Sequence, residues 1–191
     1  MNPSTALLRA QLRCHPATPA GVALSISAEL RTHGESLRLR YTLRGDTSAL
    51  RIPAPAAPTP HDGLWQHTCF EAFVAANSEP DYREFNFSPS SQWAAYRFSG
   101  ERVRDAEAEA RERALPMPPP MIETTPSALT LTVRLPVAGL PRSPAVLNIG
   151  LCAVIEERDG RLSYWALHHP GERPDFHHRD GRTLRLAAPL L

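Results

Sequence analysis

Hydrophobic and polar residues alternate along most of this chain, in short runs that are typical of half-buried β-strands. The first clear runs are Val22–Leu30 and Ser36–Leu43, with Gly34 as a turn residue between them. Together they predict an antiparallel hairpin. Similar runs predict further strands at Trp65–Val74, Tyr82–Phe87, Trp93–Phe98, Leu129–Leu135, Val146–Glu156, Leu162–His168 and Thr183–Leu186.

Proline clusters at Pro53–Pro60 and Pro116–Pro120 interrupt this pattern, because proline fixes φ and lacks a backbone donor. Residues 105–115 (DAEAEARERAL) have a helical composition and end before Pro116. They show little apolar stripe and predict a solvated surface helix or an ordered loop, which could cover a sheet face or lie clear of it. The whole pattern predicts a single all-β domain over residues 1–191, an antiparallel two-sheet β-sandwich of immunoglobulin-like or jelly-roll type.

The segment from Leu64 to Phe98 combines aromatic, acidic and amide residues on neighbouring predicted strands. Side chains alternate between the two faces of a strand, and we expect the face that carries Phe70 and Phe85 to pack against the core. Acidic and amide residues then share the other side. Aromatic rings stack on the CH faces of sugars, and hydroxyls need fixed polar partners. This face therefore predicts a carbohydrate site made of Trp65, Glu71, Glu84, Asn86 and Trp93. The alternative is a solvated face with cross-strand glutamate–arginine pairs.

A second hypothesis rests on histidines near the end of the chain and in the central segment. The i, i+2 spacing of Asp175 and His177 places both side chains on one face of an extended segment, where they could bind a metal. The weak metal candidates are His67, His168, Asp175 and His177. No single pattern supplies three ligands at a fixed spacing.

An enzyme is the less favoured alternative. Glu71 and Glu84 could form the carboxyl pair of a hydrolase. The chain has no Gly-x-Ser-x-Gly, phosphate-loop or His-Glu-x-x-His motif. We therefore expect a non-catalytic protein without a cofactor, and a protein-interaction scaffold is a further alternative.

The amino-acid composition limits the kinds of ligand and partner that we expect for this protein. The formal net charge is +1, which does not favour binding to nucleic acid or to anionic membranes. Every basic side chain is arginine, so lysine chemistry such as a Schiff base is excluded. Three cysteines without Cys-x-x-Cys spacing predict neither a disulfide framework nor a zinc ribbon. The short apolar patch at Ala6–Leu8 is too short for a secretory signal or a membrane span, so we expect a soluble, cytoplasmic protein.

Three motifs, LWQHTCFEAFV at 64–74, YREFNFSPSSQWAAYRF at 82–98 and PDFHH at 174–178, resemble the bacterial DOMON-like proteins. These are relatives of DOMON domains and of family 9 carbohydrate-binding modules, and the resemblance extends from about Val22 to Leu186. It implies a sandwich that binds its ligand on a concave sheet face, with a small polar partner such as a saccharide. Family 9 modules hold sugar rings between aromatic side chains, and acidic and amide groups bond the hydroxyls. Trp65, Trp93, Glu71 and Asn86 could play those parts.

Some members of the wider group bind haem through methionine with lysine or histidine. This chain has no lysine, and Met117 and Met121 lie in a proline-rich segment, which speaks against haem.

Overall fold

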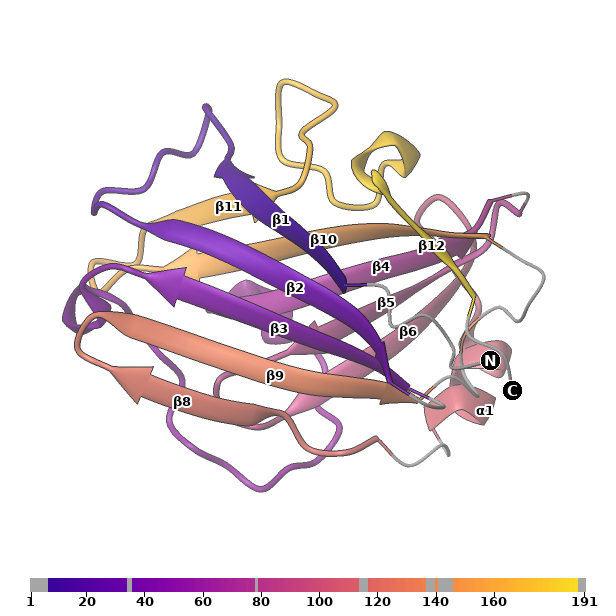
Figure 1. Cartoon of the computed structure of the whole chain (residues 1–191), viewed down its shortest axis with the longest axis horizontal. Helices are drawn as coiled ribbons and strands as arrows, with labels where there is room; N and C mark the ends of the chain where they lie inside the picture. The colour runs from indigo at the N-terminus through magenta and orange to yellow at the C-terminus, as the bar shows by residue number, and fades with distance from the viewer. Residues whose placement is uncertain are drawn as a thin grey trace.

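The computed structural model describes residues 7–33, 36–77, 79–113, 117–136, 140 and 146–188, and it folds them mainly into β-strands in two layers (Figure 1). The strands are β1 Leu7–Cys14, β2 Ser25–His33, β3 Ser36–Arg44, β4 Cys69–Ala76, β5 Tyr82–Phe87, β6 Trp93–Gly100, β7 Val103–Arg104, β8 Met121–Thr125, β9 Ala128–Pro136, β10 Val146–Glu156, β11 Leu162–Ala166 and β12 Leu184–Ala187. Helix α1 spans Ala106–Arg113, and 3-10 turns lie at η1 Thr47–Ala49, η2 Leu64–Gln66 and η4 Arg179–Gly181.

The strands pair antiparallel throughout. We call the layer with the order β1-β2-β3-β9-β8 the front sheet and the layer with the order β11-β10-β4-β5-β6-β7 the back sheet, as they lie in Figure 1. Strand β12 pairs with β10. Strand β1 also pairs with β11, at Arg13 opposite Ala166 and Cys14 opposite Trp165, and so joins the two layers. This architecture confirms the predicted antiparallel β-sandwich.

The core lies between the two sheets and consists of the alternate residues that the sequence pattern predicts. Leu39 and Tyr41 of β3 and Phe70 and Phe87 of the back sheet are fully buried. The rings of Tyr41 and Phe70 lie 5.1 Å apart, so the sheets are in direct contact. Trp165 is 6% exposed within this core. Close packing of these side chains supplies most of the hydrophobic stabilisation.

Most predicted strands are confirmed, with shifted ends. Strands β2 and β3 pair along their whole length, whereas the turn residue Gly34 lies outside the described residues. The strand predicted from Trp65 begins only at Cys69, because Gly63 at φ 79° starts a 3-10 turn over Leu64–Gln66. Strand β1 was not predicted. Its alternation of Leu8, Ala10 and Leu12 with polar residues was present, but the flanking arginines concealed it.

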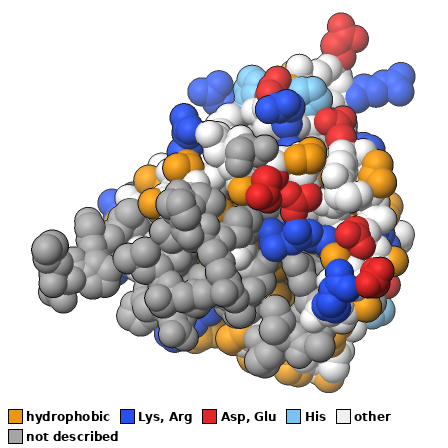
Figure 2. Space-filling model, turned by 90° about the vertical axis from the view of Figure 1, so that its right-hand side faces the viewer, with side chains coloured by type: hydrophobic (Ala, Val, Ile, Leu, Met, Phe, Trp, Pro, Cys, Tyr) orange, Lys and Arg blue, Asp and Glu red, His pale blue; other side chains and the backbone are white. Residues whose placement is uncertain are grey.

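Helix α1 follows β7 and packs beside β6. The side chain of Asp105 accepts a hydrogen bond of 2.9 Å from the backbone N–H of Ala108, which caps the helix start. Figure 2 shows the end of the molecule where α1 lies, and there arginine and acidic side chains sit next to each other. Within the described residues, no helix combines the length and apolar character that a membrane span needs.

Candidate functional site

A cavity of about 720 Å³ lies on the outer face of the back sheet, the side that points away from the core. Alternation along the strands explains its floor: Phe70 and Phe85 point into the core, so their neighbours Glu71 and Glu84 point outward. The floor residues are Glu71 and Phe73 of β4, Glu84 of β5, Tyr96 and Phe98 of β6, Val154 of β10 and Tyr164 of β11.

Three loop segments build the walls of this cavity. They are the segment before β4, the segment around β7, and the loop between β11 and β12. They contribute Asp62, Gly63, Trp65, Gln66, Arg102, Arg104, Pro174, Phe176 and His177. Trp65 is 51% exposed and is the large aromatic side chain that stands at the rim. The lining thus combines six phenylalanine, tyrosine and tryptophan rings with six acidic, arginine and histidine side chains.

The two carboxyl groups on the cavity floor are unusually buried, since Glu71 is 2% and Glu84 is 5% exposed. Burial raises the pKa of Glu71 well above its ordinary value, and the nearby charge of Glu84 adds to this effect. Burial also raises the pKa of Glu84 to about 7, although a hydrogen bond from Asn86 opposes the shift. That bond runs from Asn86 Nδ2 to Glu84 Oε1 at 2.9 Å.

Two buried oxygen atoms at this floor have no hydrogen-bond partner among the described residues: Glu71 Oε1 and Asn86 Oδ1. Glu71 and Asn86 are direct cross-strand neighbours on β4 and β5. Buried polar atoms without a partner cost free energy in a folded protein. Glu71 lines the cavity, so one of these two oxygens belongs to a residue of the cavity floor.

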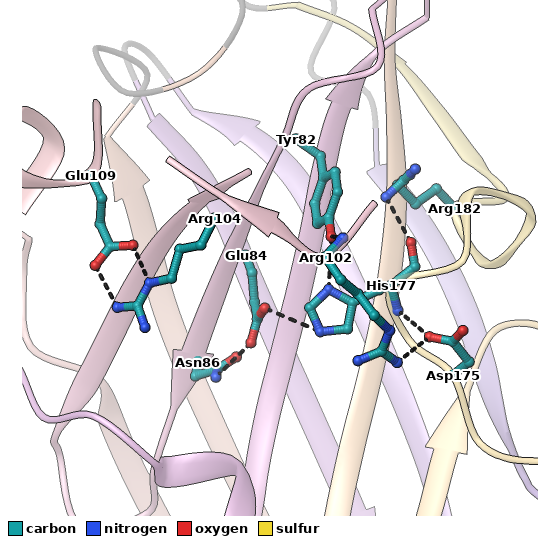
Figure 3. A network of polar contacts seen from close by, with 9 residues as sticks. All are labelled: Tyr82, Glu84, Asn86, Arg102, Arg104, Glu109, Asp175, His177 and Arg182. Carbon is teal, nitrogen blue, oxygen red and sulfur yellow. Dashed lines mark hydrogen bonds and ion pairs between the residues drawn. The ribbon is translucent and has the colours of Figure 1, made fainter. Parts of the chain in front are cut away.

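A chain of polar contacts fixes His177 beside Glu84 (Figure 3). The hydroxyl of Tyr82 accepts the backbone N–H of Arg102 at 3.1 Å and lies 2.8 Å from Nδ1 of His177. In the tautomer of neutral His177 that carries its proton on Nε2, Nδ1 accepts the Tyr82 hydroxyl proton, and Nε2 lies 3.7 Å from Glu84 Oε2. Burial lowers the pKa of His177 to about 4, so this neutral form is favoured.

Two arginines reach the cavity from the segment around β7, and each is held by an acidic side chain (Figure 3). Arg102 Nη2 donates to Asp175 Oδ1 at 2.7 Å. Arg104 donates two hydrogen bonds to Glu109 of α1, at 2.7 and 2.6 Å, and its guanidinium lies 4.5 Å from the ring centre of Tyr96. Within the described residues, α1 does not line the cavity, but it orients one of the cavity arginines. The sequence left open whether this segment covers the sheet face, and its described part lies clear of the cavity lining.

The structure brings most of the predicted carbohydrate-site residues together. Trp65, Glu71 and Glu84 line the cavity, and Asn86 bonds Glu84. Trp93 is placed differently from the expectation: it is 5% exposed and packs in the core between the sheets. Its cross-strand partner is Phe87, a core residue, and directly paired residues share a face. The register of β6, rather than the nearby turn, therefore determines its position.

The predicted metal candidates do not converge. His67 pairs through Nδ1 with Glu156 at 2.8 Å, whereas His177 bonds Tyr82. The described part of the chain contains no group of three histidine, cysteine, aspartate or glutamate side chains that could hold a metal ion.

Several cavity residues were not predicted from the sequence. Tyr96 and Phe98 were within a predicted strand, and Tyr96 lies directly opposite Glu84. Alternation along β6 could have identified both. Arg102 and Arg104 carried no sequence signal, because only the hairpin between β6 and β7 turns them towards the cavity.

The antiparallel β-sandwich of this chain is similar to that of solved structures that include family 9 carbohydrate-binding modules. A crystal structure from Bacteroides uniformis, of a protein proposed to bind carbohydrate, has a TM-score of 0.66 at 14% identity and covers 95% of this chain and 86% of its own.

A family 9 module from Caldicellulosiruptor kristjanssonii in complex with cellotriose has a TM-score of 0.52 at 8% identity, covering 83% of this chain and 72% of its own. Its glucose complex has the same TM-score and identity, with coverages of 83% and 74%. No family model and no curated protein matches the chain. These similarities establish the fold.

Proposed function

We propose that this protein binds a saccharide, without turning it over, in the cavity on the outer face of the back sheet. The observation that carries the proposal is the lining: aromatic rings surround two buried carboxyl groups in a cavity of about 720 Å³. Ligand pockets of small molecules commonly have about 300 to 1,000 Å³ and a few placed polar groups. Sugars need both stacking surfaces and hydrogen-bond partners, and this cavity offers both.

Two further observations support a saccharide. Neighbours of the same fold hold cellotriose and glucose, which makes these two sugars the first ligands to test. The motif resemblance to DOMON-like proteins points to the same ligand class, and we include membership of that group in the proposal.

Trp65 allows a direct test of binding. It is 51% exposed, whereas Trp93 and Trp165 are 5% and 6% exposed, so acrylamide quenching of tryptophan fluorescence reports mainly on Trp65. A sugar that stacks on this ring should protect it from quenching. The same sugar should raise the melting temperature, since a ligand at 100 times its Kd adds about 2.7 kcal/mol to stability.

The variant Trp65→Ala should lose the thermal response to the sugar. Met121→Ala is the matched control, because Met121 is an exposed hydrophobic side chain on β8 of the front sheet. The control should respond like the natural chain. If no mono- or oligosaccharide raises the melting temperature or protects Trp65, carbohydrate binding is refuted.

One observation favours a second function, hydrolysis of a glycosidic bond. The pKa of Glu84 is about 7 and its carboxyl faces His177, which suits general acid–base catalysis near neutral pH. Release of reducing sugar or of a chromogenic aglycone would support it, and loss of that release in Glu84→Gln would assign the residue. Sugar binding without any product release would leave the non-catalytic function.

A further inference from the structure

The outer face of the front sheet, on the opposite side of the sandwich from the cavity, carries an unusual row of like charges. Arg31 of β2 lies directly opposite Arg38 of β3, and Arg38 lies directly opposite Arg134 of β9. Paired residues share a face, and neighbouring strands lie about 4.8 Å apart. Three guanidinium-bearing side chains therefore stand side by side across three strands. Like charges in this arrangement destabilise a sheet, so the row needs an explanation.

The next row of residues on the same face contains little negative charge to offset these three arginines. Glu29 of β2 lies between Arg9 of β1 and Arg40 of β3. Its carboxylate pairs with Arg9, at 2.9 Å between Arg9 Nε and Glu29 Oε1. The Nε atom of Arg40 is buried and has no hydrogen-bond partner among the described residues. One carboxylate thus faces several guanidinium groups, and one donor remains unused.

These side chains surround a small hollow of about 130 Å³. It is lined by Leu7, Arg9, Glu29, Arg31, Arg38 and Arg40. A water molecule occupies about 30 Å³ in the liquid, so the hollow has room for a compact anion together with water. Within its lining there is no aromatic ring on which a base or a sugar could stack. Size and charge together favour a compact anion.

We propose that this hollow is a binding site for a tetrahedral oxyanion, a phosphate or sulfate group. The planar guanidinium groups of Arg31, Arg38 and Arg40 offer paired N–H donors, which match the oxygens of such a group. The bound anion would offset the repulsion along the row. The site is independent of the carbohydrate cavity, because it lies on the other sheet.

Titration of the chain of residues 1–191 with inorganic phosphate, at constant ionic strength maintained with sodium chloride, tests the proposal. The melting temperature should rise with phosphate beyond its value in chloride alone. In Arg38→Gln the apparent affinity for phosphate should fall roughly tenfold or more, since hydrogen bonds to charged groups are worth at least that factor. Arg44→Gln is the matched control. Arg44 lies on the same strand and face, but opposite Ser25 and Ala128 instead of arginines.

A melting temperature that responds to phosphate no more than to chloride would overturn the proposal. An equal phosphate response in Arg38→Gln and in the natural chain would overturn it as well. Removing Arg38 should itself raise the melting temperature at low salt, because one repulsive neighbour is lost, and this rise shows that the variant folds.

Co-sedimentation with phosphatidylcholine vesicles containing phosphatidic acid distinguishes the source of the anion. Vesicle binding that disappears in Arg38→Gln supports a lipid headgroup, whereas a phosphate response without vesicle binding supports a free anion.

Discussion

The side chains of Glu84 and His177 lie 3.7 Å apart, and their environments shift their pKa values in opposite directions. Burial raises the pKa of Glu84 from 4.5 to about 7, so between these values the folded state holds a proton that the unfolded state has lost. Stability therefore falls as the pH rises through this range. Burial lowers the pKa of His177 from 6.5 to about 4. The folded state then binds fewer protons than the unfolded state, and stability falls as the pH drops through this range.

The two contributions have similar size. Each pKa differs by about 2.5 between the folded and unfolded states, which corresponds to about 3 kcal/mol for each group. Because the signs are opposite, the effects largely cancel in the natural chain where the ranges overlap. Single substitutions should separate them. Glu84→Gln keeps an acceptor for Asn86, and His177→Asn keeps an acceptor for the hydroxyl of Tyr82.

Urea unfolding of the natural chain and both variants, between about pH 4.5 and 8.5, measures the difference in stability directly. Relative to the natural chain, Glu84→Gln should gain up to about 3 kcal/mol as the pH rises from 4.5 to 7. His177→Asn should gain relative stability as the pH falls below 6.5. Glu84→Gln also removes the charge that helps to raise the pKa of Glu71, and this change adds to the relative gain of the variant with rising pH without altering its sign. Differences that do not depend on pH, or that slope in the same direction, would refute the assigned protonation states.

Four substitutions, one of them the Trp65→Ala variant introduced above, test the packing and the site. Trp93→Ala should lower the free energy of unfolding by about 3 to 5 kcal/mol because it empties part of the core. Trp65→Ala should change this free energy by less than about 0.5 kcal/mol, because Trp65 is exposed. Similar losses for the two variants in urea unfolding would contradict the contrast in burial. Tyr41→Phe removes a hydrogen bond of 2.6 Å to a buried β4 carbonyl and should cost about 1 to 3 kcal/mol, and an unchanged urea midpoint would show that the bond contributes nothing. Glu109→Gln frees Arg104 and should weaken sugar binding in calorimetry, while an unaltered Kd would remove α1 from the site.

The amino-acid sequence determined which face of each central strand is apolar. Alternation is a local property with a period of two, so Phe70 and Phe85 could be assigned to the core, and Glu71 and Glu84 to the opposite face, before any strand was paired. The same reasoning gave the hairpin of β2 and β3. It failed for Trp93, whose orientation was judged from a nearby turn instead of from its cross-strand partner.

Only the tertiary structure decided how distant segments complete the sites. The hydroxyl of Tyr82 meets His177, a residue 95 positions further along the chain, and Glu109 reaches back to orient Arg104 over the cavity. The opposed arginines of the front sheet likewise depend on the pairing of β3 with β9. Pairing between segments far apart in sequence is fixed by the packing of the whole sandwich, and no local period in the chain encodes it.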